Sequence, residues 1–185
     1  MSRPGFSRAC RAFAAAAVAC AIGVAPVRAG APSEHQVKAA FLYNFANFVQ
    51  WPEGAFASAT APLKVCVVGT DPFGAALDDA FRGQQVQGRG VQVSRGATLG
   101  VVGRCHVLFL SLSEQGRWPD LLRELGTAPT LTVADGSPLV KQGGMVSFVI
   151  EAKRVRFEIN RGAAEQAGLR ISSKLLALAK IVESD

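Results

Sequence analysis

LKVCVVG, residues 63–69, and the TDPFGAALDDAFRG that follows it, residues 70–83, decide the fold class. The first half is a short apolar run that ends in glycine, which is typical of a buried strand. The second half predicts a helix with Thr70 or Asp71 as its cap, Pro72 at its first position and a glycine as its stop. A buried strand that leads directly into a helix indicates an α/β protein.

The same alternation of strand and helix continues along the chain. Apolar or alternating runs predict further strands at residues 87–96, 105–111, 129–135 and 145–160, and a helix closed by glycine is expected at residues 117–126. The last strand region predicts a hairpin that turns near Ala152 and Lys153. We therefore expect a layered α/β sandwich with a central, largely parallel sheet flanked by helices and an antiparallel edge hairpin.

Helices are also expected before the first strand and at the end of the chain. Ser33 and Gln36 form a capping box, and apolar side chains at helical spacing follow until the Trp-Pro pair at residues 51–52. Packing explains most aromatic residues of AAFLYNFANFVQWP, residues 39–52, because they share one face, but Tyr43 lies off that face. The terminal helix is expected to carry on its apolar side Leu175, Leu176, Leu178, Ala179 and Val182.

Residues 1–29 have the pattern of a secretory signal peptide. Three arginines precede the uncharged apolar run of residues 12–26, and Val27-Arg28-Ala29 suits a cleavage site. The apolar run is too short to span a membrane. We expect cleavage near Ala29, export to the periplasm and a single α/β domain of residues 30–185. The alternative is a lipoprotein signal that is acylated at Cys20.

Cleavage at this site would change the charge of the protein. The predicted signal carries four arginines and no acidic residue, so the formal charge falls from +6 to +2. Nucleic-acid binding proteins present a concentrated basic stripe. The densest basic cluster here is KRVR, residues 153–156, which alternates with apolar residues as the solvent side of a strand does. No nucleic-acid partner is expected.

Cys66 and Cys105 are the two cysteines that remain after cleavage. An even number in an oxidising compartment indicates one disulfide, and two inert buried thiols are the alternative. The spacing of cysteines and histidines does not suggest a metal site, and no cofactor is expected.

The sequence shows no catalytic set. Ser111, Ser113 and Glu114 follow a predicted strand, but the histidine nearest in sequence, His106, lies at the far end of that strand. A serine nucleophile needs an adjacent base, and no nucleophile-elbow motif is present.

The turn VVGTDPFG, residues 67–74, lies where ligands often bind in open α/β sheets. It lacks both the dinucleotide and the phosphate-loop motifs, so turn and cap chemistry is the simpler interpretation. Asp71, Asp135 and Glu158 are candidates for acid–base work, but nothing in their spacing brings them together.

Seven segments, in order over nearly the whole mature chain, carry a resemblance to a known family. They are KAAFLYNFANFVQWP (38–52), VCVVGTDPFG (65–74), GRCHVLFLSLSE (103–114), LTVAD (131–135), GGMVSFV (143–149), VRFEIN (155–160) and AGLRISSKLLALA (167–179). Together they resemble the YfiR family. The resemblance implies a non-enzymatic periplasmic regulator that binds and inhibits the periplasmic sensor part of a membrane-bound diguanylate cyclase, which lowers cyclic di-GMP and restrains biofilm formation. It also implies sequestration by an outer-membrane lipoprotein and a Cys66–Cys105 bridge.

Three residues are candidates for partner or ligand binding. Glu158 and Arg170 are charged residues inside apolar stretches that match the family pattern, and a structural salt bridge is the alternative. Tyr43 is a candidate aromatic anchor, or else packs on a second surface such as that of a homodimer partner. A different class of function also stays open: a periplasmic binding module for a small molecule or cell-wall fragment, without a cyclase partner.

Overall fold

The computed structural model describes residues 30–136 and 138–183. The predicted signal peptide, its cleavage site at Ala29 and Cys20 lie outside these residues. From Pro32 onward the chain forms one compact unit.

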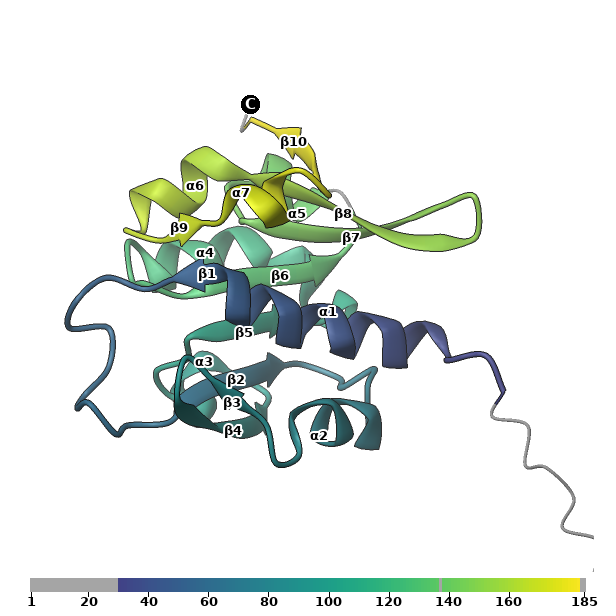
Figure 1. The fold of residues 1–185 in the computed structure, drawn as a ribbon. Helices are drawn as coiled ribbons and strands as arrows, with labels where there is room; N and C mark the ends of the chain where they lie inside the picture. The colour runs from purple at the N-terminus through teal and green to yellow at the C-terminus, as the bar shows by residue number, and fades with distance from the viewer. Residues whose placement is uncertain (1–29, 137, 184–185) are drawn as a thin grey trace, which may run out of the picture. The chain divides into compact units, whose positions relative to one another are not determined.

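An eight-stranded sheet forms the centre of this unit (Figure 1). Its strands follow the spatial order β10-β8-β7-β6-β5-β2-β4-β3. The five strands from β7 to β4 are mutually parallel, as the sequence predicted, and β10 runs parallel to β8. The pairs β7–β8 and β3–β4 are antiparallel. The bounds are β2 (Leu63–Val68), β3 (Gln85–Val86), β4 (Arg89–Gly96), β5 (Val107–Leu110), β6 (Leu131–Asp135), β7 (Val146–Glu151), β8 (Arg154–Asn160) and β10 (Lys180–Val182).

Helices cover both faces of the sheet, and a second sheet of two strands lies beside them. Side chains of α1 and α2 join the core on one face, and those of α3, α4 and α5 join the core on the other. The helices are α1 (Glu34–Phe48), α2 (Ala75–Phe81), α3 (Leu99–Val102), η1 (Leu112–Arg117, a 3-10 helix), α4 (Trp118–Leu125), α5 (Pro138–Lys141), α6 (Arg161–Gln166) and α7 (Ser173–Leu176). The small sheet pairs β1 (Val49–Gln50) with β9 (Arg170–Ile171) in antiparallel fashion.

The central strands β2 and β5 are apolar at every position except Lys64, because both of their faces are buried. In β2, Val65 and Val67 point into the core under α1, whereas Cys66 and Val68 point into the core under α4. Strand β5 divides its side chains in the same way. A strand buried on both faces has no polar side, and this explains the continuous apolar runs in the sequence.

Helix α1 begins and packs as the sequence predicted. The Ser33 hydroxyl accepts a hydrogen bond from the Gln36 backbone N–H, and the Gln36 side chain accepts one from the Ser33 N–H. Phe45 is fully buried and lies 5.0 Å, centroid to centroid, from Phe157 on β8. The aromatic residues of this helix therefore mainly serve the core.

Helix α2 begins later than predicted. Its first residue is Ala75, and Gly74, with φ of +52°, occupies the cap position. The Asp71 carboxylate instead accepts the Phe73 backbone N–H at 2.8 Å, so Pro72 lies in a turn before the helix. The prediction of Thr70 or Asp71 as the cap was wrong, because this local side-chain turn competes with helix initiation.

The predicted terminal helix is also wrong. Residues 161–182 form two short helices, α6 and α7, that alternate with the strands β9 and β10. Gly168, with φ of +73°, follows α6 and redirects the chain. Val182 lies in a strand and Leu178 is exposed, so the helical spacing of apolar residues is overridden by pairing of β9 with β1 and of β10 with β8.

Candidate functional site

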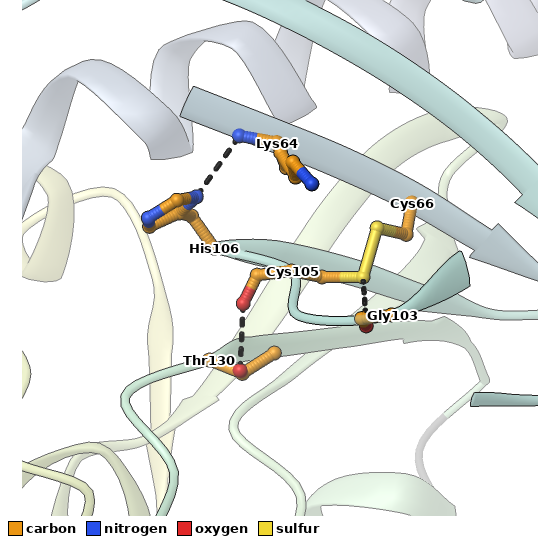
Figure 2. Close-up of a disulfide and its surroundings, with 6 residues drawn as sticks. All are labelled: Lys64, Cys66, Gly103, Cys105, His106 and Thr130. Atoms are coloured by element: carbon orange, nitrogen blue, oxygen red, sulfur yellow. Dashed lines mark hydrogen bonds between the residues drawn. A yellow bond between two sulfur atoms is a disulfide. The ribbon is translucent and has the colours of Figure 1, made fainter. Parts of the chain in front are cut away.

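A disulfide joins Cys66 on β2 to Cys105, which lies just before β5 (Figure 2). The two Cα atoms are 6.0 Å apart and both side chains are buried in the core under α4. The Thr130 hydroxyl, at the entry to β6, donates a 2.7 Å hydrogen bond to the Cys105 carbonyl. The bridge and this hydrogen bond together fasten three neighbouring strands at one end of the sheet.

His106 is packed beneath the loop that connects β1 to β2. Its Nδ1 accepts the Lys64 backbone N–H at 2.9 Å, so this nitrogen carries no proton (Figure 2). Its ring stacks on Phe56 at 4.1 Å, and the Arg89 guanidinium lies 3.9 Å from the Phe56 ring centroid. Burial lowers the pKa of His106, the Ala55 carbonyl partly opposes this, and the charge of Arg89 lowers the pKa further.

Tyr43 packs against helix α2 of the same chain. Its ring meets the Phe81 ring edge-on at a centroid distance of 5.7 Å, and its hydroxyl donates to the Gln84 side-chain oxygen at 3.3 Å. The residue is half-buried. Much of the ring therefore serves the contact between α1 and α2.

Glu158 lies on β8 with an exposed fraction of 4%. Its carboxylate accepts a 2.8 Å hydrogen bond from the Lys180 ammonium on the neighbouring strand β10. This hydrogen bond holds the pKa of Lys180 above its usual value. The ion pair joins β10 to β8, so the salt-bridge partner of Glu158 is Lys180 and not Arg170.

Arg170 lies on β9 and is exposed. Its side chain lines a groove of about 660 Å³ formed by α6, β9 and α7. We call this hollow the Arg170 groove; it is lined by Arg161, Ala164, Glu165, Gly168, Leu169, Arg170, Ile171, Ser173 and Leu176. Tyr43 and Glu158 do not line it, so the structure places the three candidate residues in three different environments.

The sequence analysis did not single out Arg161 and Glu165 of this groove. The Arg161 guanidinium lies 2.6 Å from the Glu165 carboxylate across one turn of α6. The segment RGAAEQ, residues 161–166, indicates this pair, because it places opposite charges at positions i and i+4 shortly before Arg170 in the sequence. The pair was missed because residues 161–166 were not assigned to an element of their own.

The three carboxylates that were candidates for acid–base work are kept apart. Each binds a different cation: Asp71 with Arg95 at 2.6 Å, Asp135 with Lys38 at 2.7 Å, and Glu158 with Lys180 at 2.8 Å. The pairs hold α1, β4 and β10 to their neighbours.

The serines after β5 take part in local backbone contacts. The Ser113 hydroxyl accepts the Thr70 backbone N–H at 3.0 Å and lies 3.4 Å from a Glu114 carboxylate oxygen. The Glu114 carboxylate in turn pairs with Arg117 at 3.0 Å. His106 precedes β5, at the strand's opposite end, so the structure does not bring this base to Ser113.

Within residues 30–136 and 138–183, no helix is long and apolar enough to cross a membrane. Nor does this part contain three or more His, Cys, Asp or Glu side chains grouped so that they could hold a metal ion.

Comparison with known proteins places this fold in a family. One solved structure that partly matches this chain is an ABC domain in complex with L-Trp from Streptococcus pneumonia, with 12% identity and a TM-score of 0.48; the match covers 65% of this chain and 55% of that one. The chain thus spans about half the length of that structure. The model of the YfiR/HmsC-like family matches residues 35–180. That family is regulatory, non-catalytic and periplasmic, and it is linked to diguanylate cyclase signalling. The chain belongs to the YfiR/HmsC-like family.

Proposed function

We propose that this chain is an exported regulator that binds the periplasmic sensor part of a membrane-bound diguanylate cyclase and inhibits it. Inhibition lowers cyclic di-GMP and restrains biofilm formation. The observation that carries the proposal is the family match over residues 35–180, which takes in α1 and nearly every element that follows.

An inhibitor of this kind works by differential binding. It shifts a cyclase toward the inactive state only if it binds that state more tightly than the active one. A surface that holds one shape loses less conformational entropy on binding, and therefore discriminates better. The Cys66–Cys105 bridge supports this role because it fastens strands that carry the surface loops.

The Arg170 groove is our candidate for the contact with the cyclase. It offers two guanidinium groups, Arg161 and Arg170, beside the apolar side chains of Leu169 and Leu176. A cationic and apolar hollow suits a protein segment that carries both carboxylates and apolar side chains. In this proposal Glu158 acts indirectly, because it holds β10 to β8, and Tyr43 holds α1 to α2.

Sequestration by an outer-membrane lipoprotein follows from the same proposal. A lipoprotein that covers the same groove would release the cyclase by competition. A homodimer is a second arrangement that would compete for the exposed surface.

The first experiment measures cellular cyclic di-GMP in the native host with and without the gene. We expect a rise on deletion that is reversed by the exported protein and not by residues 30–185 expressed without the signal. Deleting each membrane-bound diguanylate cyclase gene in turn then identifies the target, because loss of the target abolishes the rise. An unchanged cyclic di-GMP level, with the protein present and folded in the wild type, contradicts the proposal.

A periplasmic binding module for a small molecule or cell-wall fragment is the second candidate function. The size of the Arg170 groove, about 660 Å³, favours it because ligand sites commonly have this volume. Titration of the purified protein with soluble peptidoglycan fragments, followed by calorimetry, tests this candidate. Saturable binding that Arg170→Gln abolishes, together with unchanged cyclic di-GMP on deletion, would favour the module over the cyclase inhibitor.

A further inference from the structure

The hairpin of β7 and β8 carries an apolar face that extends beyond the core. Phe148 and Phe157 are directly opposite each other in this hairpin and are buried against Phe41 of α1, at ring distances of 6.1 and 5.3 Å. The next pair outward on the same face is Ile150 and Val155. Ile150 is 52% exposed, so the apolar face continues past the point where α1 covers it.

A groove of about 540 Å³ lies between this outer part of the hairpin and the first turns of α1. We call it the hairpin groove; it is lined by Pro32, Glu34, Val37, Phe41, Ile150, Lys153, Arg154 and Val155. Its wall is mainly apolar, and none of its residues lines the Arg170 groove. In Figure 1 the hairpin projects beyond the neighbouring strands.

The charge of the hairpin groove is unbalanced. Lys153 and Arg154 are exposed at the hairpin turn, and within the part of the chain that the structure describes neither takes part in an ion pair. The acid in the groove, Glu34, is already bound by the Lys38 ammonium at 2.6 Å. Glu151 is the register partner of Arg154 in the hairpin but forms no ion pair with it, so Lys153 above all presents a free positive charge beside the exposed apolar wall.

The hairpin turn presents these cations in a fixed geometry. Ala152 and Lys153 both have positive φ, +47° and +61°, as the two central residues of a tight type I′ turn do. Asn and Gly are favoured at these two positions, and Ala and Lys cost folding free energy there. Replacing Lys153 with glycine would favour folding, so the lysine is not explained by the turn.

We propose that the hairpin groove is a docking site for a segment of the cyclase's periplasmic part that places an apolar side chain between Ile150 and Phe41. This segment carries one or two carboxylates that meet Lys153 and Arg154. The inference rests on the proposed function and adds a second contact surface to it. Charge complementarity selects this occupant over an uncharged or basic one.

The test uses the full exported chain and the purified periplasmic part of the cyclase identified by the genetic experiment. Binding is measured by calorimetry at low and high salt for the wild type, Ile150→Lys, Lys153→Gly and Arg156→Gln. Arg156 is the matched control because it belongs to the same hairpin, carries the same charge and does not line the groove. Urea unfolding of each variant accompanies the titration.

We expect Ile150→Lys to weaken binding by about tenfold or more and Lys153→Gly by about threefold, with a reduced salt dependence for Lys153→Gly. Lys153→Gly should be at least as stable as the wild type, so its effect cannot come from unfolding. Arg156→Gln should bind as the wild type does.

Three outcomes would overturn the proposal, and they are distinguishable. If all variants bind equally, the chain still contacts the cyclase, but the hairpin groove is not part of that contact. If the wild type does not bind, both the proposed function and the proposed cyclase segment in the groove are contradicted. A wild-type dimer, seen by light scattering, that Ile150→Lys converts to monomer would assign the groove to a second copy of this chain.

Discussion

The Lys38 ammonium lies 2.7 Å from the Asp135 carboxylate and so fastens α1 to the carboxyl end of β6. The lysine side chain is 6% exposed, which is unusual for a lysine. Burial alone would lower the pKa of Lys38, but the hydrogen bonds to Asp135 and Glu34 outweigh it and raise the pKa above the usual value. The ammonium therefore stays charged inside the fold.

Replacing Asp135 with asparagine should lower the free energy of unfolding by about 2–4 kcal/mol, because it leaves a largely buried ammonium with only the Glu34 carboxylate. Urea denaturation measures the change. Asp79→Asn, in an exposed pair with Arg82, should change stability by less than about 1 kcal/mol.

Folding raises the pKa of Lys38. Its contribution to stability is therefore complete below the unfolded pKa and should disappear only as pH rises through the folded pKa, above 10.5. Equal effects of the two substitutions would contradict this view of Lys38.

Removing the disulfide by Cys66→Ala together with Cys105→Ala should lower the free energy of unfolding by about 3–4 kcal/mol. The bridge spans a sequence separation of 39, and the estimate follows from the chain entropy that the closed loop removes from the unfolded state. Denaturation with and without reductant measures the change, and the double variant should be insensitive to reductant. A wild type that reductant does not destabilise would show that the bridge contributes nothing to stability.

Acidification should destabilise the protein through His106. Since burial lowers the folded pKa of this histidine below 6.5, the unfolded state binds the proton first, and stability is lost as pH falls from about 6.5 toward the folded pKa. The slope from this one group cannot exceed about 1.4 kcal/mol per pH unit. Unfolding at several pH values, compared between the wild type and His106→Gln, measures it. His35→Gln is the control, because that histidine is exposed on α1. A slope that persists unchanged in His106→Gln would assign the acid sensitivity to other groups.

Gly69→Ala should lower the free energy of unfolding by more than about 2 kcal/mol. A Cβ atom at this position would lie 2.5 Å from the Ser113 hydroxyl oxygen, and φ is +91°. Gly54→Ala separates the two causes, since Gly54 has a similar φ of +86° with open space around it. We expect Gly54→Ala to cost only the backbone term, about 1 kcal/mol. Similar losses for the two variants would mean that Ser113 moves aside without cost.

Arg170→Glu should abolish inhibition of the cyclase while leaving stability nearly unchanged, because the side chain is exposed and only its backbone pairs with Gln50. Cyclic di-GMP in the complemented deletion strain reports inhibition, and periplasmic protein level and urea denaturation report folding. Lys174→Glu is a comparable charge reversal on α7 outside the Arg170 groove. Full inhibition by Arg170→Glu would remove this residue from the candidate contact.

The central sheet could be predicted because its signals are local. The apolar run at residues 63–68 and the capping box at Ser33 each determine their own element. The last third of the chain could not be predicted in this way. Residues 170–171 and 180–182 become strands only because β1 and β8 offer open edges to them, and this information lies elsewhere in the sequence.

The candidate site residues could also be predicted only where their signals were local. Glu158 and Arg170 were visible as charges inside apolar stretches, but their surroundings depend on distant pairing. The hairpin groove was hidden in the sequence because KRVR, residues 153–156, also fits the solvent side of a strand. Which face of a strand stays uncovered depends on where the helix opposite it begins, and α1 begins at Glu34.

The pairing of Val49 with Ile171 joins the first strand to the last third of the chain. This contact closes a very long loop, and the loss of chain entropy has to be met before the contact forms. In a chain that emerges from the ribosome amino end first, helix α1 is available long before β9. The small sheet of β1 and β9 therefore cannot form until residues 170–171 are available, and the Arg170 groove beside it depends on the last part of the chain.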